Sequence, residues 1–278
     1  MSLTVRKMKF DIDDDMDMLF VKNDPEASCY LNAISLMLPY LEPYIIRSFK
    51  QALPQVSDNE LRNNMELFIK QEAQHFQQHQ RYNEVVRKHY PGVEKFEIKI
   101  KEDFDSFLEN EDIKFNIGYV EGFEALTTGM SIISLDGGMC TRAEGTAGDL
   151  FRWHFCEEVE HRTIAYDVYH DLYDGYWHRA KMTAFALKHM AIFIKNVMSI
   201  MLKQESIRIN TEYNGTAGKF KRMNRFMRKE FWLYSKATLR PFNPKYSPYK
   251  LDVPQHIFDL ADAYTEEAID IGKTPLNP

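Results

Sequence analysis

The chain has 278 residues, of which 44% are apolar and 27% are charged, and its formal net charge at pH 7 is −6. This composition excludes a disordered or fibrous protein and indicates a core large enough to fold without disulfide or metal staples. The mild acidity argues against a protein that binds nucleic acid. The cysteines, Cys29, Cys140 and Cys156, are far apart, and no apolar signal segment opens the sequence. We therefore expect a reduced, cytoplasmic chain.

Apolar residues recur mainly at spacings of three and four, which predicts an all-α protein. An irregular acidic arm is expected over 1–25, a four-helix bundle over 26–176, and C-terminal helices over 177–278 that pack on the bundle within the same domain. The predicted helices, in chain order, are 28–53, 57–90, 113–135, 144–173, 177–203, 219–239 and 254–271. Pro39 and Pro43 are expected to interrupt the first helix, and residues 95–111 to form a charged connection.

Two C-terminal segments bear on a membrane role. Residues 182–202 are the most apolar stretch, but they include Lys188 and Lys195, so we predict a buried or interfacial helix rather than a membrane span. The segment Lys219–Arg240 carries eight basic residues and one acid, interleaved with aromatic and methionine side chains. An amphipathic helix packed on the bundle is the favoured interpretation, and contact with an anionic membrane surface is the alternative.

The sequence contains two Glu-x-x-His motifs, Glu72-Ala-Gln-His75 and Glu158-Val-Glu-His161. On a helix, residues three apart share a face, so each motif presents one carboxylate and one imidazole on the same side. Each motif is preceded, one predicted helix earlier, by a glutamate on an apolar stripe, Glu42 in the first half and Glu124 in the second.

This repeated pattern predicts a metal centre inside the bundle. A dimetal four-helix bundle takes one Glu from each of two helices and a Glu-x-x-His pair from each of the other two. Buried carboxylates without counter-charge would be very costly, and two divalent cations would cancel the charge of four. We therefore predict two bound metal ions, with iron favoured and manganese or zinc as alternatives. Glu42 is the least secure ligand because it lies between two prolines.

The sequence resembles a known group, the ferritin-like dimetal-carboxylate superfamily. It is most similar to the bacterial family of predicted metal-dependent hydrolases. The resemblance covers about 28–173 and rests on Phe68-Ile-Lys-Gln-Glu-Ala-Gln-His75, Glu124-Ala-Leu-Thr127, Trp153-His-Phe-Cys-Glu-Glu-Val-Glu-His161 and Ala165-Tyr-Asp-Val-Tyr169. It implies a helical fold, a ferritin-like four-helix bundle with additional C-terminal helices, and a dimetal centre.

Further side chains beside the six predicted ligands are candidates for supporting roles. Gln71 and Glu157 each precede a ligand glutamate, where a side chain could accept the second N–H of a ligating histidine. Thr128, one turn after Glu124, and Tyr166 are weak catalytic candidates, and helix packing is the favoured interpretation for both. His79 and His154 lie one turn from the predicted ligands and could extend the site, but hydrogen-bonded interior histidines are the favoured interpretation.

Three functions are consistent with these patterns. The expectation is an O2-dependent diiron oxidase or oxygenase acting on a small or lipid-like substrate. The first alternative is a hydrolase with a water activated by two metals, and the second is an iron-binding or storage protein. No Walker-type phosphate loop, His-Glu-x-x-His motif or Gly-x-Ser-x-Gly elbow is present. A homodimer and a membrane-peripheral location also remain open.

Overall fold

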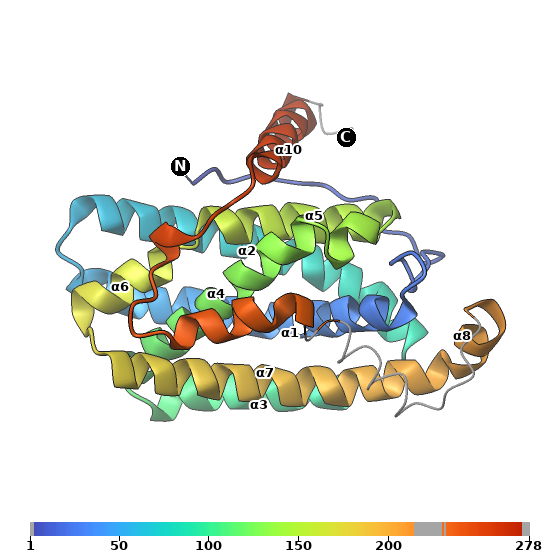
Figure 1. Ribbon diagram of the computed structural model, residues 1–278, viewed down its shortest axis with the longest axis horizontal. Coiled ribbons are helices and arrows are strands. Elements are labelled where there is room, and N and C mark those ends of the chain that lie inside the picture. Colours follow the sequence, from blue (N-terminus) through green and yellow to red (C-terminus); the bar gives the residue numbers. More distant parts are fainter. Residues whose placement is uncertain (1–2, 214–229, 231, 274–278) are drawn as a thin grey trace.

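The computed structural model describes residues 3–213, 230 and 232–273, and these residues confirm the predicted all-α class. Within them the only β pairing is an isolated bridge between Val21 and Ala143. Figure 1 shows long helices stacked around one another, an arrangement compatible with a ferritin-like bundle. The α-helices are α1 (Pro25–Ala52), α2 (Asn59–His89), α3 (Glu94–Asn110), α4 (Ile113–Leu135), α5 (Gly145–Glu160), α6 (Ile164–Leu172), α7 (Tyr176–Gln204), α8 (Ser206–Glu212) and α10 (Gln255–Lys273).

Helix α1 is continuous, so the predicted interruption at Pro39 and Pro43 is wrong. A proline at position 39 cannot donate the backbone hydrogen bond that the carbonyl of Ser35 would accept. Asn83 of α2 replaces it, because its Nδ2 donates to that carbonyl at 2.7 Å. The Ser35 hydroxyl donates back to Oδ1 of Asn83 at 2.6 Å. A neighbouring helix thus satisfies the group that the first proline exposes, and α1 carries Glu42 into the core.

The expected charged connection over 95–111 is also wrong, because these residues form α3. Opposite charges four residues apart link Lys99 to Asp103 and Lys101 to Asp105, at 2.7 and 2.6 Å. The inward face of the helix buries Ile100 and Phe104. The high charge of this segment therefore marks the solvent face of an amphipathic helix that packs on α1 and α7.

The helix predicted over 144–173 is divided in two. Helix α5 ends at Glu160 and α6 begins at Ile164, and His161 forms the junction with backbone angles of φ −91° and ψ 13°. The N–H of His161 still donates to the Glu157 carbonyl at 3.1 Å, so the last helical turn is intact up to this residue. The break places a predicted ligand at a helix terminus, where its direction is set by the turn as well as by the helix.

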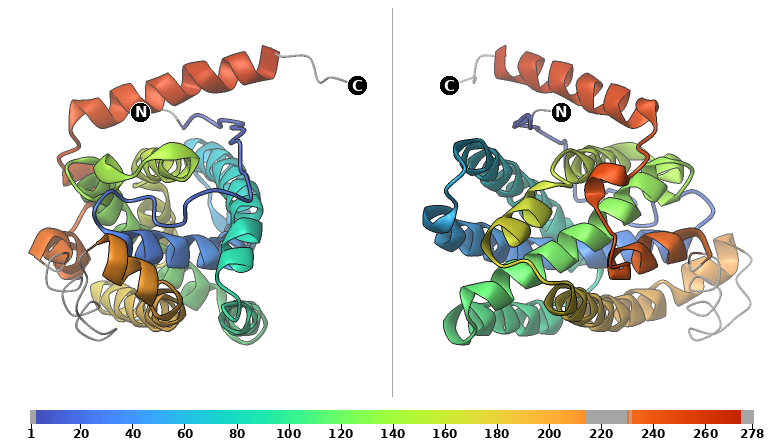
Figure 2. Two further views of the ribbon diagram at one scale, coloured as in Figure 1. Left: turned by 90° about the vertical axis from the view of Figure 1, so that its right-hand side faces the viewer. Right: turned by 60° about the vertical axis from the view of Figure 1, so that its left-hand side comes forward.

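The helices that carry the predicted ligands are in mutual contact. Helix α1 packs against α2, α4 packs against α5, and α1 also packs against α4. Helix α7 covers α4 and α1, and α10 lies against α5 on the opposite side of the molecule (Figure 2). Gly122 permits close approach of α4 and α7, since a Cβ at this position would lie 2.6 Å from the Cα of Thr183.

The N-terminal arm is ordered against the bundle rather than loosely attached. Its side chains alternate, with Arg6, Met8 and Phe10 buried and Lys7 and Lys9 exposed. This two-residue period is that of an extended chain with one face turned inward. The predicted acidic arm therefore contributes one face to the core, and one basic side chain is buried with it.

Helix α7 is long and apolar enough to cross a membrane by length and composition alone. Its inward face is buried against α4 and α1. Its outer face presents Lys181, Lys188 and Lys195, spaced seven residues apart and all exposed. This arrangement agrees with the predicted buried or interfacial helix. Most of the basic helix predicted over 219–239 lies outside the described residues. The described part of this segment over 232–239 is helical.

Candidate metal centre

The six predicted ligands converge in the interior of the bundle. All are buried, with exposed fractions of at most 4%. Helix α1 provides Glu42, α2 provides the first Glu-x-x-His pair, and α4 provides Glu124, while the second pair comes from the end of α5 and the turn after it.

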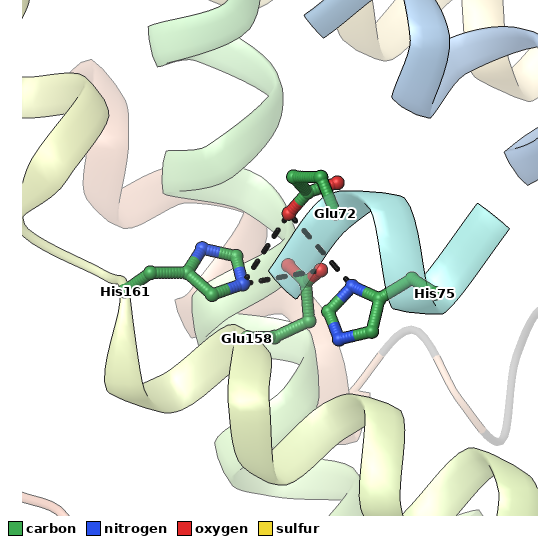
Figure 3. Close-up of side chains that lie close together, drawn as sticks. All are labelled: Glu72, His75, Glu158 and His161. Carbon is green, nitrogen blue, oxygen red and sulfur yellow. Dashed lines mark ion pairs between the residues drawn. The ribbon is translucent and has the colours of Figure 1, made fainter. Parts of the chain in front are cut away.

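The two Glu-x-x-His pairs face each other (Figure 3). Nε2 of His161 lies 3.5 Å from Oε1 of Glu72 and 3.7 Å from Oε1 of Glu158. Nδ1 of His75 lies 3.8 Å from the same Glu72 oxygen. The donor atoms of these four residues all lie within 4.8 Å of one another. Glu72 therefore has one oxygen directed at both histidines, and it links the two motifs.

Many polar atoms at this point have no hydrogen-bond partner among the described residues. They are both carboxylate oxygens of Glu42, Oε1 of Glu72 and Glu124, Oε2 of Glu158, Nδ1 of His75 and Nε2 of His161. Buried polar atoms are nearly always paired, and an ion is one of the recognised explanations for a group of exceptions. Carboxylate oxygens and imidazole nitrogens are donors that suit iron, manganese or zinc. The residues thus fit a pair of divalent cations.

The electrostatics favour the same interpretation. Burial, followed by the negative charge of neighbouring carboxylates, raises the pKa of Glu42, Glu72 and Glu124 well above the ordinary value. Burial also lowers the pKa of His75 and His161, which favours the neutral form of both rings. For Glu158, burial acts to raise the pKa, but the electrostatic interaction with His161 and the hydrogen bond with His154 lower it overall. Without cations, burying these carboxylates in their charged form therefore costs free energy.

Glu124 and Glu42 hold different positions in the cluster. Oε2 of Glu124 lies 3.1 Å from Nδ1 of His161, and its other oxygen has no partner among the described residues. Glu42 forms a second group with His75 and His154, again with donor atoms within 4.8 Å of one another. The two groups share His75, so the cluster is extended enough for more than one ion.

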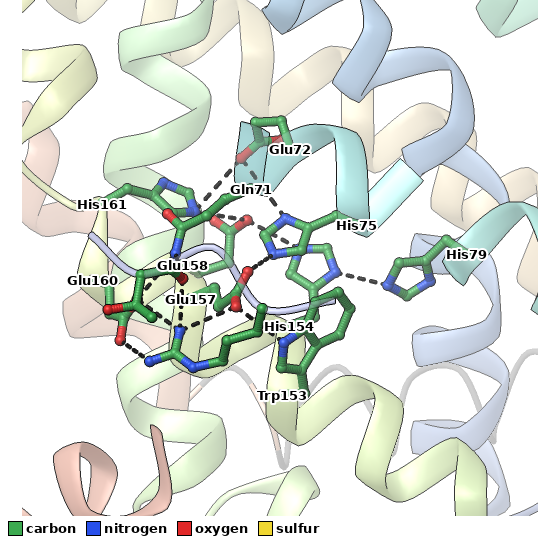
Figure 4. Close-up of polar contacts among 12 residues, drawn as sticks. Gln71, Glu72, His75, His79, Trp153, His154, Glu157, Glu158, Glu160 and His161 are labelled. Carbon is green, nitrogen blue, oxygen red and sulfur yellow. Dashed lines mark hydrogen bonds and ion pairs between the residues drawn. The ribbon is translucent and has the colours of Figure 1, made fainter. Parts of the chain in front are cut away.

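Glu157 occupies the supporting position predicted for it. Its Oε2 lies 2.9 Å from Nε2 of His75, and its Oε1 accepts the indole N–H of Trp153 at 3.0 Å (Figure 4). Burial raises the pKa of Glu157 to about 8, while the charge of Arg6 acts to lower it. An acceptor on Nε2 leaves Nδ1 of His75 free to face Glu72, the arrangement usual for a ligating histidine.

Gln71 lies elsewhere. Its amide nitrogen donates to the Thr4 carbonyl at 2.9 Å and to Oε2 of Glu160 at 3.0 Å. It thus joins the arm to the end of α5. Its Oε1, the atom that would accept from a ligand histidine, has no hydrogen-bond partner among the described residues.

His154 is hydrogen-bonded in the interior, as predicted, and it also groups with Glu42 and His75. Its Nε2 lies 3.0 Å from Oε1 of Glu158, and its Nδ1 lies 2.7 Å from Nε2 of His79. His79 in turn bonds the Ser35 hydroxyl through Nδ1, at 2.8 Å. The spacing of His154 accounts for this position, since it lies four residues before Glu158 on the same helical face.

The two weak catalytic candidates differ in their surroundings. Thr128 is fully buried on α4, one turn after Glu124, and its hydroxyl has no partner among the described residues. Tyr166 lies on α6, where its hydroxyl donates to the Tyr246 carbonyl at 3.4 Å and its ring stacks on His170. Within the described part of the chain, no hydrogen bond or ion pair joins Tyr166 to a candidate ligand.

Comparison with known proteins agrees with the metal site. Residues 4–252 match the model of the family described as predicted metal-dependent hydrolases. The chain belongs to this family. No curated protein and no solved structure gives a significant match. Membership covers the arm, all the helices that carry the cluster, and α7, so the centre belongs to the part of the chain that defines the family.

Proposed function

We propose that this protein is a metal-dependent hydrolase with two metal ions in the interior of its helical bundle. The observation that carries the proposal is the cluster of unpartnered, buried donor atoms, which the two Glu-x-x-His motifs direct at one another. Family membership supports the hydrolytic chemistry and its dependence on metal.

The proposed ligands divide into two sets. Glu42 and His75 would hold one ion, and Glu124, Glu158 and His161 the other, with Glu72 between them. We add His154 to the first set, because it groups with Glu42 and His75 and its Nδ1 is already bonded to His79. Its Nε2 also lies 3.0 Å from Glu158 of the second set. Glu157 fixes the orientation of the His75 ring, and His79 fixes that of the His154 ring.

When bound, two such ions supply an activated water and neutralise the charge that develops on a carbonyl or phosphoryl oxygen. This chemistry needs no serine or cysteine nucleophile, and the sequence offers no motif for one. The protein's own part is to hold the donors apart from bulk water, since every proposed ligand is buried. The substrate is proposed to be a small molecule with a hydrolysable ester, amide or phosphoester bond.

An O2-dependent diiron enzyme is the second candidate. One observation favours it. Among the six predicted ligands, carboxylates outnumber imidazoles, and four of the six form two Glu-x-x-His pairs, as in diiron bundles. The same ligands would serve either reaction, so the distinction must come from measured turnover. The iron-storage alternative predicts ion uptake without turnover of either kind.

The test compares turnover of both kinds in one preparation. Protein stripped with chelator is reloaded with Zn²⁺, Mn²⁺ or Fe²⁺ and assayed without oxygen against panels of esters, amides and phosphoesters. Oxygen consumption by the Fe²⁺ form is measured separately. Glu72→Gln is the inactivating variant, and Glu84→Gln, at an exposed position of the same helix, is its matched control.

Metal-dependent hydrolysis that Glu72→Gln abolishes and Glu84→Gln retains would support the proposal. Rapid oxygen consumption without hydrolysis would replace it by the oxidative candidate. Metal uptake with neither activity would favour storage.

A further inference from the structure

A buried arginine of the N-terminal arm is attached to the candidate metal centre from outside the ligand set. Arg6 is 2% exposed, although it comes from an extended segment with no helix of its own. Nη1 of Arg6 donates to Oε1 of Glu157 at 3.0 Å and to Oε2 of Glu160 at 2.9 Å. Nη2 donates to the other oxygen of Glu160 at 2.6 Å. One guanidinium therefore fixes two carboxylates on the last turn of α5, with the planar geometry that arginine offers.

This arginine also ties three separate parts of the chain together. Its Nε donates to Thr265 of α10 at 2.9 Å, and its Nη1 donates to the Thr4 carbonyl of the arm at 3.1 Å. Gln71 of α2 bonds the same carbonyl and the same Glu160. Figure 4 shows Glu157, Glu160 and Gln71 gathered on the side of the cluster where the arm passes.

The path from Arg6 to the cluster is short. Glu157 uses Oε1 for Arg6 and Trp153, and Oε2 for Nε2 of His75. When one oxygen of a carboxylate is fixed, the other oxygen has little freedom to rotate. Arg6 therefore determines the position of Oε2 of Glu157, the acceptor for His75. That acceptor in turn directs the Nδ1 atom of His75 toward Glu72.

We propose that Arg6 is a positioning residue of the metal centre, which sets the orientation of His75 through Glu157 and makes metal binding depend on a docked N-terminal arm. The inference rests on the proposed function, because it assigns His75 to a bound ion. It predicts that Arg6 affects metal affinity although it is not a ligand. Loss of an outer partner of this kind typically weakens metal binding about 10–100-fold.

The test titrates chelator-stripped full-length protein with Co²⁺ and follows the visible absorption of the bound ion. Arg6→Met removes the guanidinium, and Arg6→Lys keeps the charge but loses the two-carboxylate geometry. Lys7→Met is the matched control, since it changes a neighbouring cation that is exposed. Circular dichroism in chelator checks that each variant is folded, and Arg6→Lys serves if Arg6→Met is not.

We expect the Arg6 variants to bind Co²⁺ about 10–100-fold more weakly with an altered absorption band, and Lys7→Met to match the parent. In a Glu157→Gln background, Arg6→Met should add little, because the path through Glu157 is already broken. Unchanged affinity and spectrum in a folded Arg6 variant would overturn the role given to Arg6, as would full additivity with Glu157→Gln. A parent protein that binds no Co²⁺ would instead overturn the metal centre itself.

Discussion

The imidazole rings of His75 and His154 stack face to face, with centroids 4.1 Å apart and planes inclined by 16°. One ring comes from α2 and the other from α5, so the stack joins the two helices that carry the Glu-x-x-His motifs. Burial, and then the proximity of His154, lowers the pKa of His75, because a second positive charge at this distance would be repelled. The pair therefore places imidazole nitrogens of both helices in the same region.

The first prediction concerns His154. Replacing it by Gln should weaken the binding of the ion at the Glu42 set by about 10–100-fold and that of the other ion less, because His154 belongs to the first group and contacts the second only through Glu158. Stepwise Co²⁺ or Zn²⁺ titration separates the two binding events. His256→Gln, at a histidine more than half exposed, is the control and should behave as the parent. Equal weakening of both ions would show that His154 acts on the fold rather than on one site.

The second prediction concerns the prolines of α1. Asn83→Ala should destabilise the protein by about 1–3 kcal/mol, because the Ser35 carbonyl then lies buried without a donor. In a Pro39→Ala background the new backbone N–H can reach that carbonyl, and the cost of Asn83→Ala should fall by at least about 1 kcal/mol. Urea unfolding of the four proteins of this cycle measures the coupling. Additive costs would mean that Asn83 does not compensate for the proline.

These prolines show where sequence reasoning succeeds and where it stops. The spacing of Glu72, His75, Glu158 and His161 lies within single helical turns, so it could be read from the chain, and the structure brings all four together. The continuity of α1 depends on Asn83, a partner 48 residues from the carbonyl that it satisfies. Local rules about proline do not contain such a contact, and they misplace a helix break beside Glu42.

Glu157 could be predicted from neighbouring residues in the sequence, whereas Arg6 could not. Glu157 precedes a ligand in the sequence and could be proposed as its partner by position alone. Arg6 reaches the site only because the arm folds back on α5, a contact between residues 151 apart. The alternation of buried Met8 and Phe10 with exposed lysines marks the inward face of the arm. This two-residue period covers too few residues to be recognised in a sequence dominated by helical spacing.

The third prediction concerns stability against pH without metal. Carboxyls with a raised folded-state pKa bind more protons in the folded than in the unfolded chain, so their contribution to stability falls as pH rises through that pKa. Burial raises the pKa of Glu121 to about 7 and that of Glu157 to about 8. In chelator, the free energy of unfolding should therefore increase as pH falls from about 8.5 to about 6.5.

Below about pH 6.5 the gain in stability should become shallower, since the unfolded histidines take up protons that buried His75, His79 and His161 do not. Glu121→Gln should flatten the dependence between about pH 8.5 and 6.5, and exposed Glu84→Gln should not. Added metal should stabilise the protein more at high pH, because protons compete for the ligands. A metal-free protein that gains stability steadily up to pH 8.5 would contradict the raised carboxyl pKa values.

The most direct measurement is the metal content of folded protein after reloading and removal of excess ions. The account predicts about two ions per chain in the parent and in Glu84→Gln, and loss of both in the double variant Glu72→Gln/Glu158→Gln. Circular dichroism shows that each sample remains folded. A folded parent with less than one ion per chain, or a double variant that retains the parental content, would contradict the metal centre.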